Sequence, residues 1–338
     1  MSANERSMTA ESDTSIHHPG SDSRPRTRLA PSPTGDLHLG NARTFLCNWA
    51  LARRLGWSII LRHEDLDASR AVPGSCERIE ASLHWLGLDW DGPSRLQSEN
   101  LDPYIDAMRT LAGGDLVFRS DLSRREVREA IGAPHGGELV FPATLRPIER
   151  DRWGFMDRSA GHRFAMPGGE EVVRDEIFGT CTFDPAKEGG DPVVWTRDGR
   201  PAYQLAVVVD DLLDGVTDIV RGDDLLSSAA RQQRLGQALG RGTPPRWWHL
   251  PLVHDQDGRR LSKRDGDLGL DALRTAGVSP ERVVGLLLHL GGFVPEPAPI
   301  HARDAVGLIN PERLTTLSES ERGSPCRLGQ EDLDWLRS

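Results

Sequence analysis

Hydrophobic and polar residues near the start of the chain follow a pattern typical of a parallel α/β fold. Residues 1–27 are rich in Ser, Asp, Arg and Pro and carry almost nothing to bury, so we expect a disordered tail there. Residues 28–30 then predict a short strand that ends at a Pro and Gly turn. An amphipathic stretch over 41–55 predicts a helix, and the apolar stretch 58–62 predicts a second strand. This order predicts a βαβ unit, which requires a parallel sheet.

The remaining elements are predicted from shorter patterns. Helical spacing of apolar residues predicts helices over 74–86, 231–239 and 280–290. Short apolar runs predict strands over 203–209, 219–220 and 250–253. Residues from about 119 to 162 are arginine-rich and interrupted by Gly and Pro, and they predict an insertion into the α/β domain.

Composition narrows the class of protein. A length of 338 residues predicts about two domains. Hydrophobic residues at 37% and charged residues at 27% indicate a soluble globular chain. The longest apolar stretch near the end, Val283–Leu290, is too short to cross a membrane. Four scattered cysteines exclude a disulfide framework and a CxxC metal site and favour a reducing, cytoplasmic location. The net charge of −10 argues against non-specific polyanion binding but leaves room for a local basic patch.

Two short motifs carry the chemistry. The turn Pro31–Gly35, followed by His38 and Gly40, lies between a predicted strand and a predicted helix, where backbone N–H groups favour an anion. His38 could donate a hydrogen bond to phosphate charge, and Gly40 would let a base or ribose approach the backbone. The alternative for this motif alone is a structural turn that caps the helix.

The second motif is Arg260–Arg264, which reads Arg-Leu-Ser-Lys-Arg. Only two of the 41 basic residues are lysine, Lys187 and Lys263, so a lysine here requires a reason beyond general positive charge. Its compact, mobile ammonium suits a migrating phosphate. A solvated basic loop is the alternative.

Together these motifs resemble a known family. Residues 28–43 resemble the glutamyl-tRNA synthetase form of the class I HIGH motif, and residues 261–264 resemble the KMSKS loop. Residues 61–67 resemble the family's LRIEDTD segment, and residues 203–211 with 218–224 resemble its second amino-acid-binding stretch. The resemblance extends from about residue 28 to 290 with consistent order and spacing.

The resemblance implies an α/β fold with the Rossmann-type parallel sheet of class I aminoacyl-tRNA synthetases, an inserted subdomain and a short helical C-terminal part. Only 74 residues follow Arg264, so we expect no anticodon-binding domain and a match to the truncated glutamyl-Q tRNA(Asp) synthetases. The implied parts are a disordered tail over 1–27, the first half of the catalytic domain over 28–118, an inserted acceptor-type subdomain over 119–165, the second half of the catalytic domain over 166–240, the KMSKS loop and helical part over 241–295, and a C-terminal tail over 296–338.

The same resemblance implies a reaction and its residues. Enzymes of this group activate L-glutamate with ATP and Mg²⁺, without tRNA, and transfer it to queuosine in the anticodon loop of tRNA(Asp). The implied glutamate-binding residues are Arg28, Ala30, Ser32, Glu64, Tyr203 and Arg221. The implied ATP-binding residues are His38, Gly40, Ser262 and Lys263, with His38 and Lys263 acting in catalysis. We expect a cytoplasmic monomer with no membrane partner.

One departure from the group concerns zinc. Members often hold this metal with three cysteines and a tyrosine in the inserted segment, and the matching positions here are Ser120, Leu122, Phe141 and Leu145. Leu and Phe offer no lone pair to a metal, so we expect no zinc and no other protein-bound metal. Apolar packing of Leu122, Phe141 and Leu145 is expected to replace it.

Two other functions stay open at this point. The chain could be an ordinary glutamyl-tRNA synthetase that charges the 3′ end of tRNA, although the expected lack of an anticodon-binding part weighs against this. It could also be a non-catalytic paralogue that binds tRNA or an amino acid.

Overall fold

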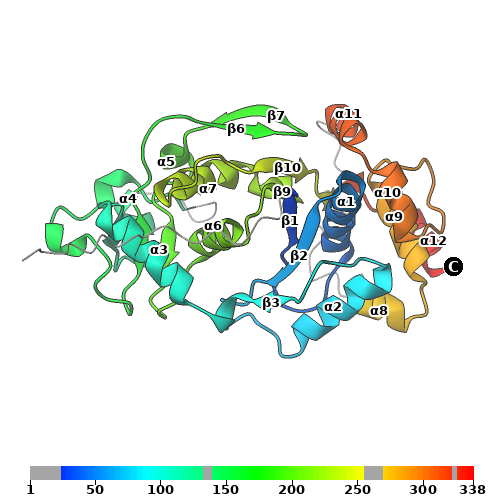
Figure 1. The fold of residues 1–338 in the computed structure, drawn as a ribbon, viewed down its shortest axis with the longest axis horizontal. Coiled ribbons are helices and arrows are strands. Elements are labelled where there is room, and N and C mark those ends of the chain that lie inside the picture. The colour runs from blue at the N-terminus through cyan, green and yellow to red at the C-terminus, as the bar shows by residue number, and fades with distance from the viewer. Residues whose placement is uncertain (1–23, 132–138, 255–268, 322–325) are drawn as a thin grey trace, which may run out of the picture.

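A parallel sheet and a mostly parallel sheet meet edge to edge at the centre of the molecule (Figure 1). The computed structural model describes residues 24–131, 139–254, 269–321 and 326–338. One sheet has the order β1 (Arg26–Leu29), β2 (Ser58–His63) and β3 (Arg95–Leu96), all parallel. The other has the order β7 (Gly179–Phe183), β6 (Glu171–Asp175), β10 (Arg246–Leu250) and β9 (Asp218–Gly222), parallel except for the β6–β7 pair. The predicted parallel sheet is confirmed.

The contact between the two sheets lies at β1 and β9. The Thr217 N–H donates to the Arg26 carbonyl at 2.9 Å, and the Arg26 N–H donates to the Thr217 hydroxyl at 2.8 Å. Residues 26 and 27 therefore belong to β1, and the predicted tail extends too far by these residues because Thr27 is completely buried.

The βαβ unit is confirmed. Helix α1 (Leu39–Leu55) joins β1 to β2, and Arg26–Leu29 pair in register with residues 58–61. The His38 ring caps the start of α1, and Gly56 ends it with a φ of 70°, a left-handed conformation that favours glycine. Helix α2 (Ser75–Leu86) also matches its prediction.

The strand predicted over 203–209 is wrong, because this segment forms helix α6 (Tyr203–Leu213). The apolar run Leu205–Val209 is buried between α3 (Asp102–Gly113) and α7 (Leu226–Ala238). A continuous apolar run fits a buried helix as well as a buried strand, so its sequence does not distinguish the two.

The strand predicted over 250–253 is split in the structure. Leu250 ends β10, and β11 (Val253–His254) pairs with β12 (Cys326–Arg327). Pro251, which has no backbone N–H to donate, lies between the two strands.

The C-terminal region is more regular than the predicted tail over 296–338. It contains α10 (Ala302–Leu308), α11 (Pro311–Glu321) and α12 (Gln330–Arg337), which follow α8 (Leu270–Thr275) and the correctly predicted α9 (Pro280–Leu290). Buried Ala302, Ala305 and Ile309 join the core formed with α1 and α9. The apolar residues of this C-terminal region are widely spaced in the sequence, so the sequence alone does not show that they belong to the core.

None of the helices in the described ranges is long and apolar enough to cross a membrane.

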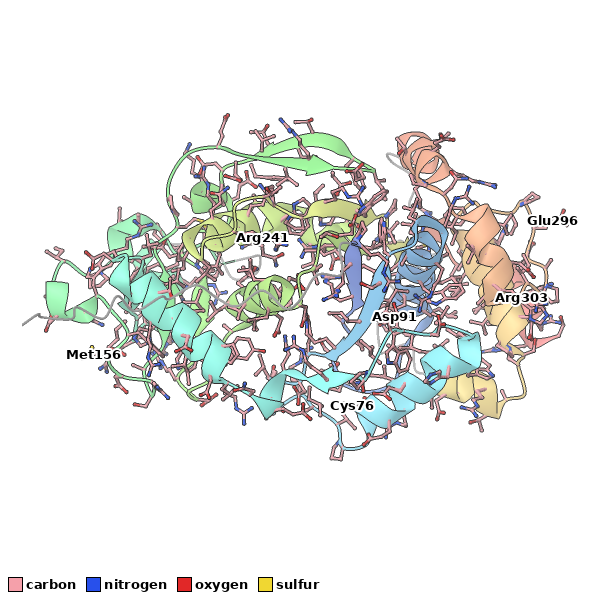
Figure 2. All side chains as sticks on the ribbon, viewed as in Figure 1. Cys76, Asp91, Met156, Arg241, Glu296 and Arg303 are labelled. Atoms are coloured by element: carbon pink, nitrogen blue, oxygen red, sulfur yellow. The ribbon has the colours of Figure 1, made fainter. Side chains whose placement is uncertain are left out.

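The inserted subdomain lies at the end of the molecule opposite α9 and α10, as Met156 and Arg303 mark in Figure 2. Its antiparallel sheet has the order β4 (Val117–Arg119), β5 (His162–Phe164) and β8 (Val193–Trp195), flanked by α4 (Arg124–Ile131). This sheet includes β8, which lies beyond the predicted end of the insertion at 165.

The predicted apolar packing in this subdomain is confirmed for Phe141 and Leu145 but not for Leu122. Phe141 is 1% exposed and packs against Phe118 and Val127, with Leu145 partly buried beside them. Leu122 is 37% exposed, so its predicted contribution is wrong.

Phe141→Ala is expected to destabilise the protein by about 3–5 kcal/mol, because it leaves a cavity among packed aromatic rings. Leu122→Ala is the matched control and is expected to change the unfolding free energy by less than about 0.5 kcal/mol, since its side chain is exposed. Urea unfolding followed by tryptophan fluorescence measures both. Equal losses in the two variants would contradict the packing described here.

Candidate active site

A cavity of about 400 Å³ lies where the parallel strands β1, β2 and β9 end. Open parallel sheets bind ligands at this edge, where loops and helix starts converge. All predicted site residues that the structure describes line this cavity, namely Arg28, Ala30, Ser32, His38, Gly40, Glu64, Tyr203 and Arg221. Ser262 and Lys263, the other two, lie outside the described residues.

His38 lies between the turn after β1 and the start of α1. Its Nδ1 accepts a hydrogen bond from the Gly40 N–H at 3.1 Å. The neutral ring therefore carries its proton on Nε2, which is the nitrogen able to donate. The structural role of a helix cap and the predicted role of a phosphate donor are compatible in this one side chain.

The residues on either side of 255–268 lie at the same cavity. Val253 lines it, and Gly269 forms a β-bridge with His38. The Leu270 N–H donates to the Leu37 carbonyl at 2.8 Å, and the Arg43 guanidinium donates to the Pro251 carbonyl. These contacts attach both flanks to α1 and the turn before it.

Arg221 is a buried cation whose hydrogen-bond partners among the described residues are all uncharged. Its Nε donates to His249 Nε2 at 3.0 Å, Nη1 to Gln232 Oε1 at 2.7 Å, and Nη2 to the Leu225 carbonyl at 3.0 Å. Burial lowers the pKa of Arg221 to about 10. Among the described residues, two of its five N–H donors have no acceptor, which leaves capacity for a bidentate anion.

Arg28 is equally buried but has a carboxylate partner. Its Nε lies 3.3 Å from Asp211 Oδ1, and its Nη1 donates to the Val220 carbonyl at 3.4 Å. Arg62 also contacts Asp211, at 2.8 Å, and its positive charge helps to hold the pKa of that carboxyl below its usual range in spite of burial. Arg28 thus has most of its charge balanced within the protein, and Arg221 does not.

Glu64 brings the opposite charge to the cavity. One of its oxygens lies 3.6 Å from the Arg62 guanidinium, and its backbone N–H donates to the Pro31 carbonyl at 2.9 Å. Burial raises the pKa of Glu64, and the positive charges of Arg62 and Arg28 oppose that shift. Tyr203, at the start of α6, is 43% exposed and lines the cavity with its ring. The site therefore presents cations and the Glu64 carboxylate to a zwitterionic ligand.

A second cavity, of about 610 Å³, adjoins the first. The two share four lining residues, Ser32, Glu64, Arg70 and Tyr203. The second cavity continues toward Thr196 and Arg200, which follow β8 of the inserted subdomain. Two ligands could therefore meet at Glu64 and Tyr203.

Comparison with known proteins shows the family of the chain. The model for "tRNA synthetases class I (E and Q), catalytic domain" matches residues 25–320. A glutamyl-Q tRNA(Asp) synthetase of Nitratidesulfovibrio vulgaris is 42% identical over 86% of this chain and 94% of its own length. The corresponding protein of Deinococcus radiodurans is 44% identical over 83% of this chain and 95% of its own length. The chain belongs to the class I glutamyl-Q tRNA(Asp) synthetase family.

The fold extends to larger relatives. A glutamate tRNA ligase from Elizabethkingia meningosepticum, solved in complex with its amino acid, has a TM-score of 0.74 and is 26% identical. The match covers 93% of this chain and 68% of that one. A glutamate–tRNA ligase 2 of Maricaulis maris is 42% identical over 79% of this chain but only 55% of its own length.

The zinc position common in this family does not fit a metal here. The Arg163 guanidinium lies 4.1 Å from the centre of the Phe141 ring, and its Nε donates to the Ser120 hydroxyl at 3.3 Å. Arg163 Nη1 also donates to the Asp191 carbonyl at 2.7 Å. A guanidinium therefore bridges two of the four positions expected to hold zinc ligands. Across the described ranges, no group of three or more His, Cys, Asp or Glu side chains could hold a metal ion.

Sequence reasoning missed the residues that support the site from behind. Gln232 and His249 hold Arg221, and no local pattern in the sequence marks them as functional. Asp211, which holds Arg28, lies in the motif stretch 203–211 but is given no role by the sequence. Each is separated from its arginine along the chain, so only the folded structure brings them together.

The purified protein is expected to contain no stoichiometric zinc, because Leu and Phe replace residues that donate lone pairs and Arg163 brings its own positive charge. A chelator is expected to leave thermal unfolding unchanged. Elemental analysis checks the metal content. One zinc per chain would contradict this assignment.

Proposed function

We propose that the protein activates L-glutamate with ATP, without tRNA, and transfers it to queuosine in the anticodon loop of tRNA(Asp). The observation that carries this proposal is the cavity where Arg221, Arg28 and Glu64 meet beside the His38 turn. The relatives named glutamyl-Q tRNA(Asp) synthetase, which the chain covers over 94–95% of their length, support it.

The charges of the cavity match those of glutamate. The substrate has two carboxylates and one ammonium, so its pocket requires at least one free cation and one anion. Arg221, with two donors left, suits a carboxylate, since the planar guanidinium binds such groups bidentately. Glu64 suits the ammonium, while Arg28, Ala30, Ser32 and Tyr203 complete the pocket. Glutamine would leave the cation facing a neutral amide and is expected to be a much poorer substrate.

Activation would follow by in-line displacement. An oxygen of the glutamate α-carboxylate forms a bond to the α-phosphorus of ATP, the bond from that phosphorus to the bridging oxygen breaks, and pyrophosphate leaves. Catalysis would depend on positioning and charge stabilisation rather than on a protein nucleophile. His38 would donate to the phosphates from Nε2 beside Gly40, and Ser262 and Lys263 would bind the leaving group. Mg²⁺ would neutralise phosphate charge.

The second cavity supports the acceptor step. It opens onto Glu64 and Tyr203, so an acceptor nucleoside placed there would reach the activated carboxyl group. Bases in an anticodon loop are already unstacked, so one of them could enter at a modest cost in free energy. The arginines of the inserted subdomain would position the RNA by contacting its phosphates.

An ordinary glutamyl-tRNA synthetase is the second candidate. The similarity to the Maricaulis maris glutamate–tRNA ligase favours it, because the identity equals that of the Nitratidesulfovibrio vulgaris relative. The two functions differ in where glutamate is attached. A non-catalytic paralogue would bind the ligands without releasing pyrophosphate.

The wild-type protein is expected to catalyse glutamate-dependent exchange between pyrophosphate and ATP in the absence of tRNA. With tRNA(Asp), labelled glutamate is expected on the anticodon fragment after nuclease digestion, and only when the tRNA carries queuosine. Unmodified tRNA(Asp) is the control. Label on the 3′ terminal fragment would identify an ordinary synthetase, and no exchange under any condition would identify a binding paralogue.

Lys263→Ala is expected to lower the rate of activation about 100-fold, the scale of losing one preorganised charged contact, with little change in the KM for glutamate. Lys187→Ala is the matched control. Lys187 is the other lysine, its side chain is 84% exposed, it pairs with Asp184 at 2.8 Å, and it lines neither of the two cavities. Exchange kinetics that are the same in both variants would refute the role of Lys263.

A further inference from the structure

Behind the cavity, three side chains from neighbouring parallel strands form a hydrogen-bonded chain. Asp175 ends β6, His249 lies on β10, and Arg221 lies on β9 opposite His249. His249 is completely buried, and Asp175 and Arg221 are each 5% exposed. His249 does not line the cavity, so it reaches the ligand only through Arg221.

The hydrogen bonds determine the protonation of His249. The Nε–H of arginine is always a donor, so His249 Nε2, which lies 3.0 Å from it, must be an acceptor. His249 Nδ1 lies 2.7 Å from Asp175 Oδ2 and therefore carries the proton. Burial lowers the pKa of His249, which agrees with the neutral ring that this geometry requires.

Asp175 is itself held rigidly. Its Oδ1 accepts from the Ile177 and Phe178 N–H groups at 2.9 and 2.8 Å. Its Oδ2 accepts from the His249 backbone N–H at 3.1 Å as well as from the ring. Four donors therefore determine the orientation of this carboxylate, and the carboxylate in turn determines that of the His249 ring.

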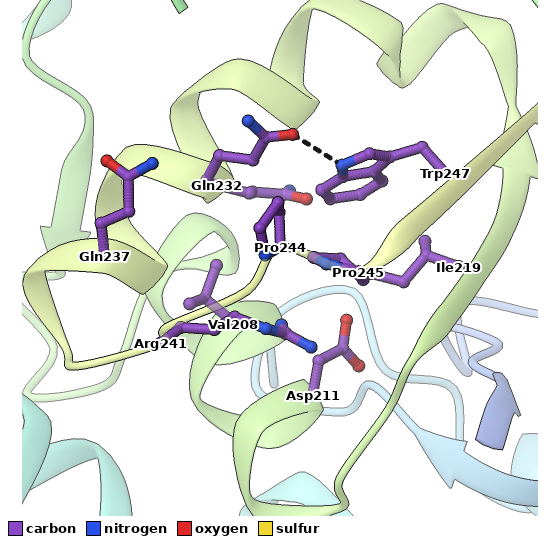
Figure 3. Close-up of a pocket in the computed structure, with 10 residues that line it drawn as sticks. Val208, Asp211, Ile219, Gln232, Gln237, Arg241, Pro244, Pro245 and Trp247 are labelled. Atoms are coloured by element: carbon purple, nitrogen blue, oxygen red, sulfur yellow. Dashed lines mark hydrogen bonds between the residues drawn. The ribbon is translucent and has the colours of Figure 1, made fainter. Parts of the chain in front are cut away.

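The aromatic ring of Trp247 packs against both His249 and Arg221. The Trp247 ring stacks on His249 with centroids 5.9 Å apart and an angle of 19°. The Arg221 guanidinium lies 4.7 Å from the centre of the same ring. The Trp247 indole N–H donates to Gln233 Oε1 at 2.8 Å, the bond drawn as a dashed line in Figure 3. Trp247 thus limits the movement of both the imidazole and the guanidinium.

We propose that Asp175 and His249 are positioning residues, which orient the Arg221 guanidinium so that its two remaining donors face the carboxylate of glutamate. The inference rests on the proposed function. A neutral acceptor at Nε forms no ion pair with Arg221, whereas a carboxylate at the same place would pair directly with the guanidinium and compete with the substrate. The chain of hydrogen bonds therefore orients the Arg221 guanidinium without forming an ion pair with it.

Two substitutions of His249 separate this role from general stability. His249→Asn keeps a donor for Asp175 but is too short to reach Arg221. His249→Gln places an amide oxygen near the position of Nε2, where it accepts from Arg221. In pyrophosphate exchange, His249→Asn is expected to raise the KM for glutamate about tenfold or more, the scale of one hydrogen bond to a charged group, with the KM for ATP unchanged. His249→Gln is expected to return the KM for glutamate to within about threefold of wild type.

Asp175→Asn provides an independent test with nearly the same volume. Its amide donor would face His249 Nδ1, so the ring would move its proton to Nε2 and point a donor at Arg221. The KM for glutamate is expected to rise as in His249→Asn. Because glutamine at 249 has no such tautomer, Asp175→Asn is expected to cost less in the His249→Gln background than alone.

Thermal unfolding of every variant identifies those that fold, and the test is read from those. If His249→Asn does not fold, the test is read from Asp175→Asn and from the double variant Asp175→Asn with His249→Gln. Equal increases in the KM for glutamate and for ATP, or His249→Gln behaving like His249→Asn, would overturn the positioning role while leaving the proposed function intact. Absence of exchange by the wild-type protein would instead overturn the proposed function and the inference that rests on it.

Discussion

The charge of Arg62 is the constraint on which the rest of the site depends. This side chain on β2 is completely buried, and its guanidinium lies 2.8 Å from Asp211 on α6 and 2.9 Å from Asp214, which caps the end of that helix. A buried charge without partners is strongly unfavourable, so α6 must remain against the sheet to supply carboxylates. Asp210, on the same helix, accepts from the Tyr104 hydroxyl at 3.0 Å and from Gln97 at 2.6 Å, which ties α3 and the segment after β3 to the same network.

This network determines how charge is distributed at the cavity. Asp211 is shared between Arg62 and Arg28, so the carboxylate that holds the helix in place also balances one of the two arginines of the site. The hydrogen-bond partners of Arg221 among the described residues are neutral, so its guanidinium keeps donors for a ligand. Two arginines that look equivalent in the sequence therefore differ in the structure, one being already paired and the other open to an anion.

In the inserted subdomain, aromatic rings and a cation occupy positions where the family resemblance implies zinc ligands. Phe141 lies among Phe118, Trp153 and Val127, and the Arg163 guanidinium covers its ring. Packing of aromatic rings and a cation on a ring face are both stabilising, and here they connect β4, β5 and the segment that holds Phe141. The subdomain keeps its antiparallel sheet, whose last strand leads to the residues of the second cavity.

The sequence by itself determined the parts of this protein that depend on neighbours along the chain. The turn from Pro31 to Gly35, the cap at His38 and the helix after it are local, and the motifs around them were enough to indicate the family and eight residues that now line one cavity. Only the tertiary structure decided the rest. Residues 203–209 form a helix packed between α3 and α7, which brings Asp210 and Asp211 to Arg62. Residues 302–309 pack their buried side chains against α1 and α9. The Asp175–His249–Arg221 chain joins three strands far apart in sequence, and no local pattern encodes a contact that exists only when those strands are paired.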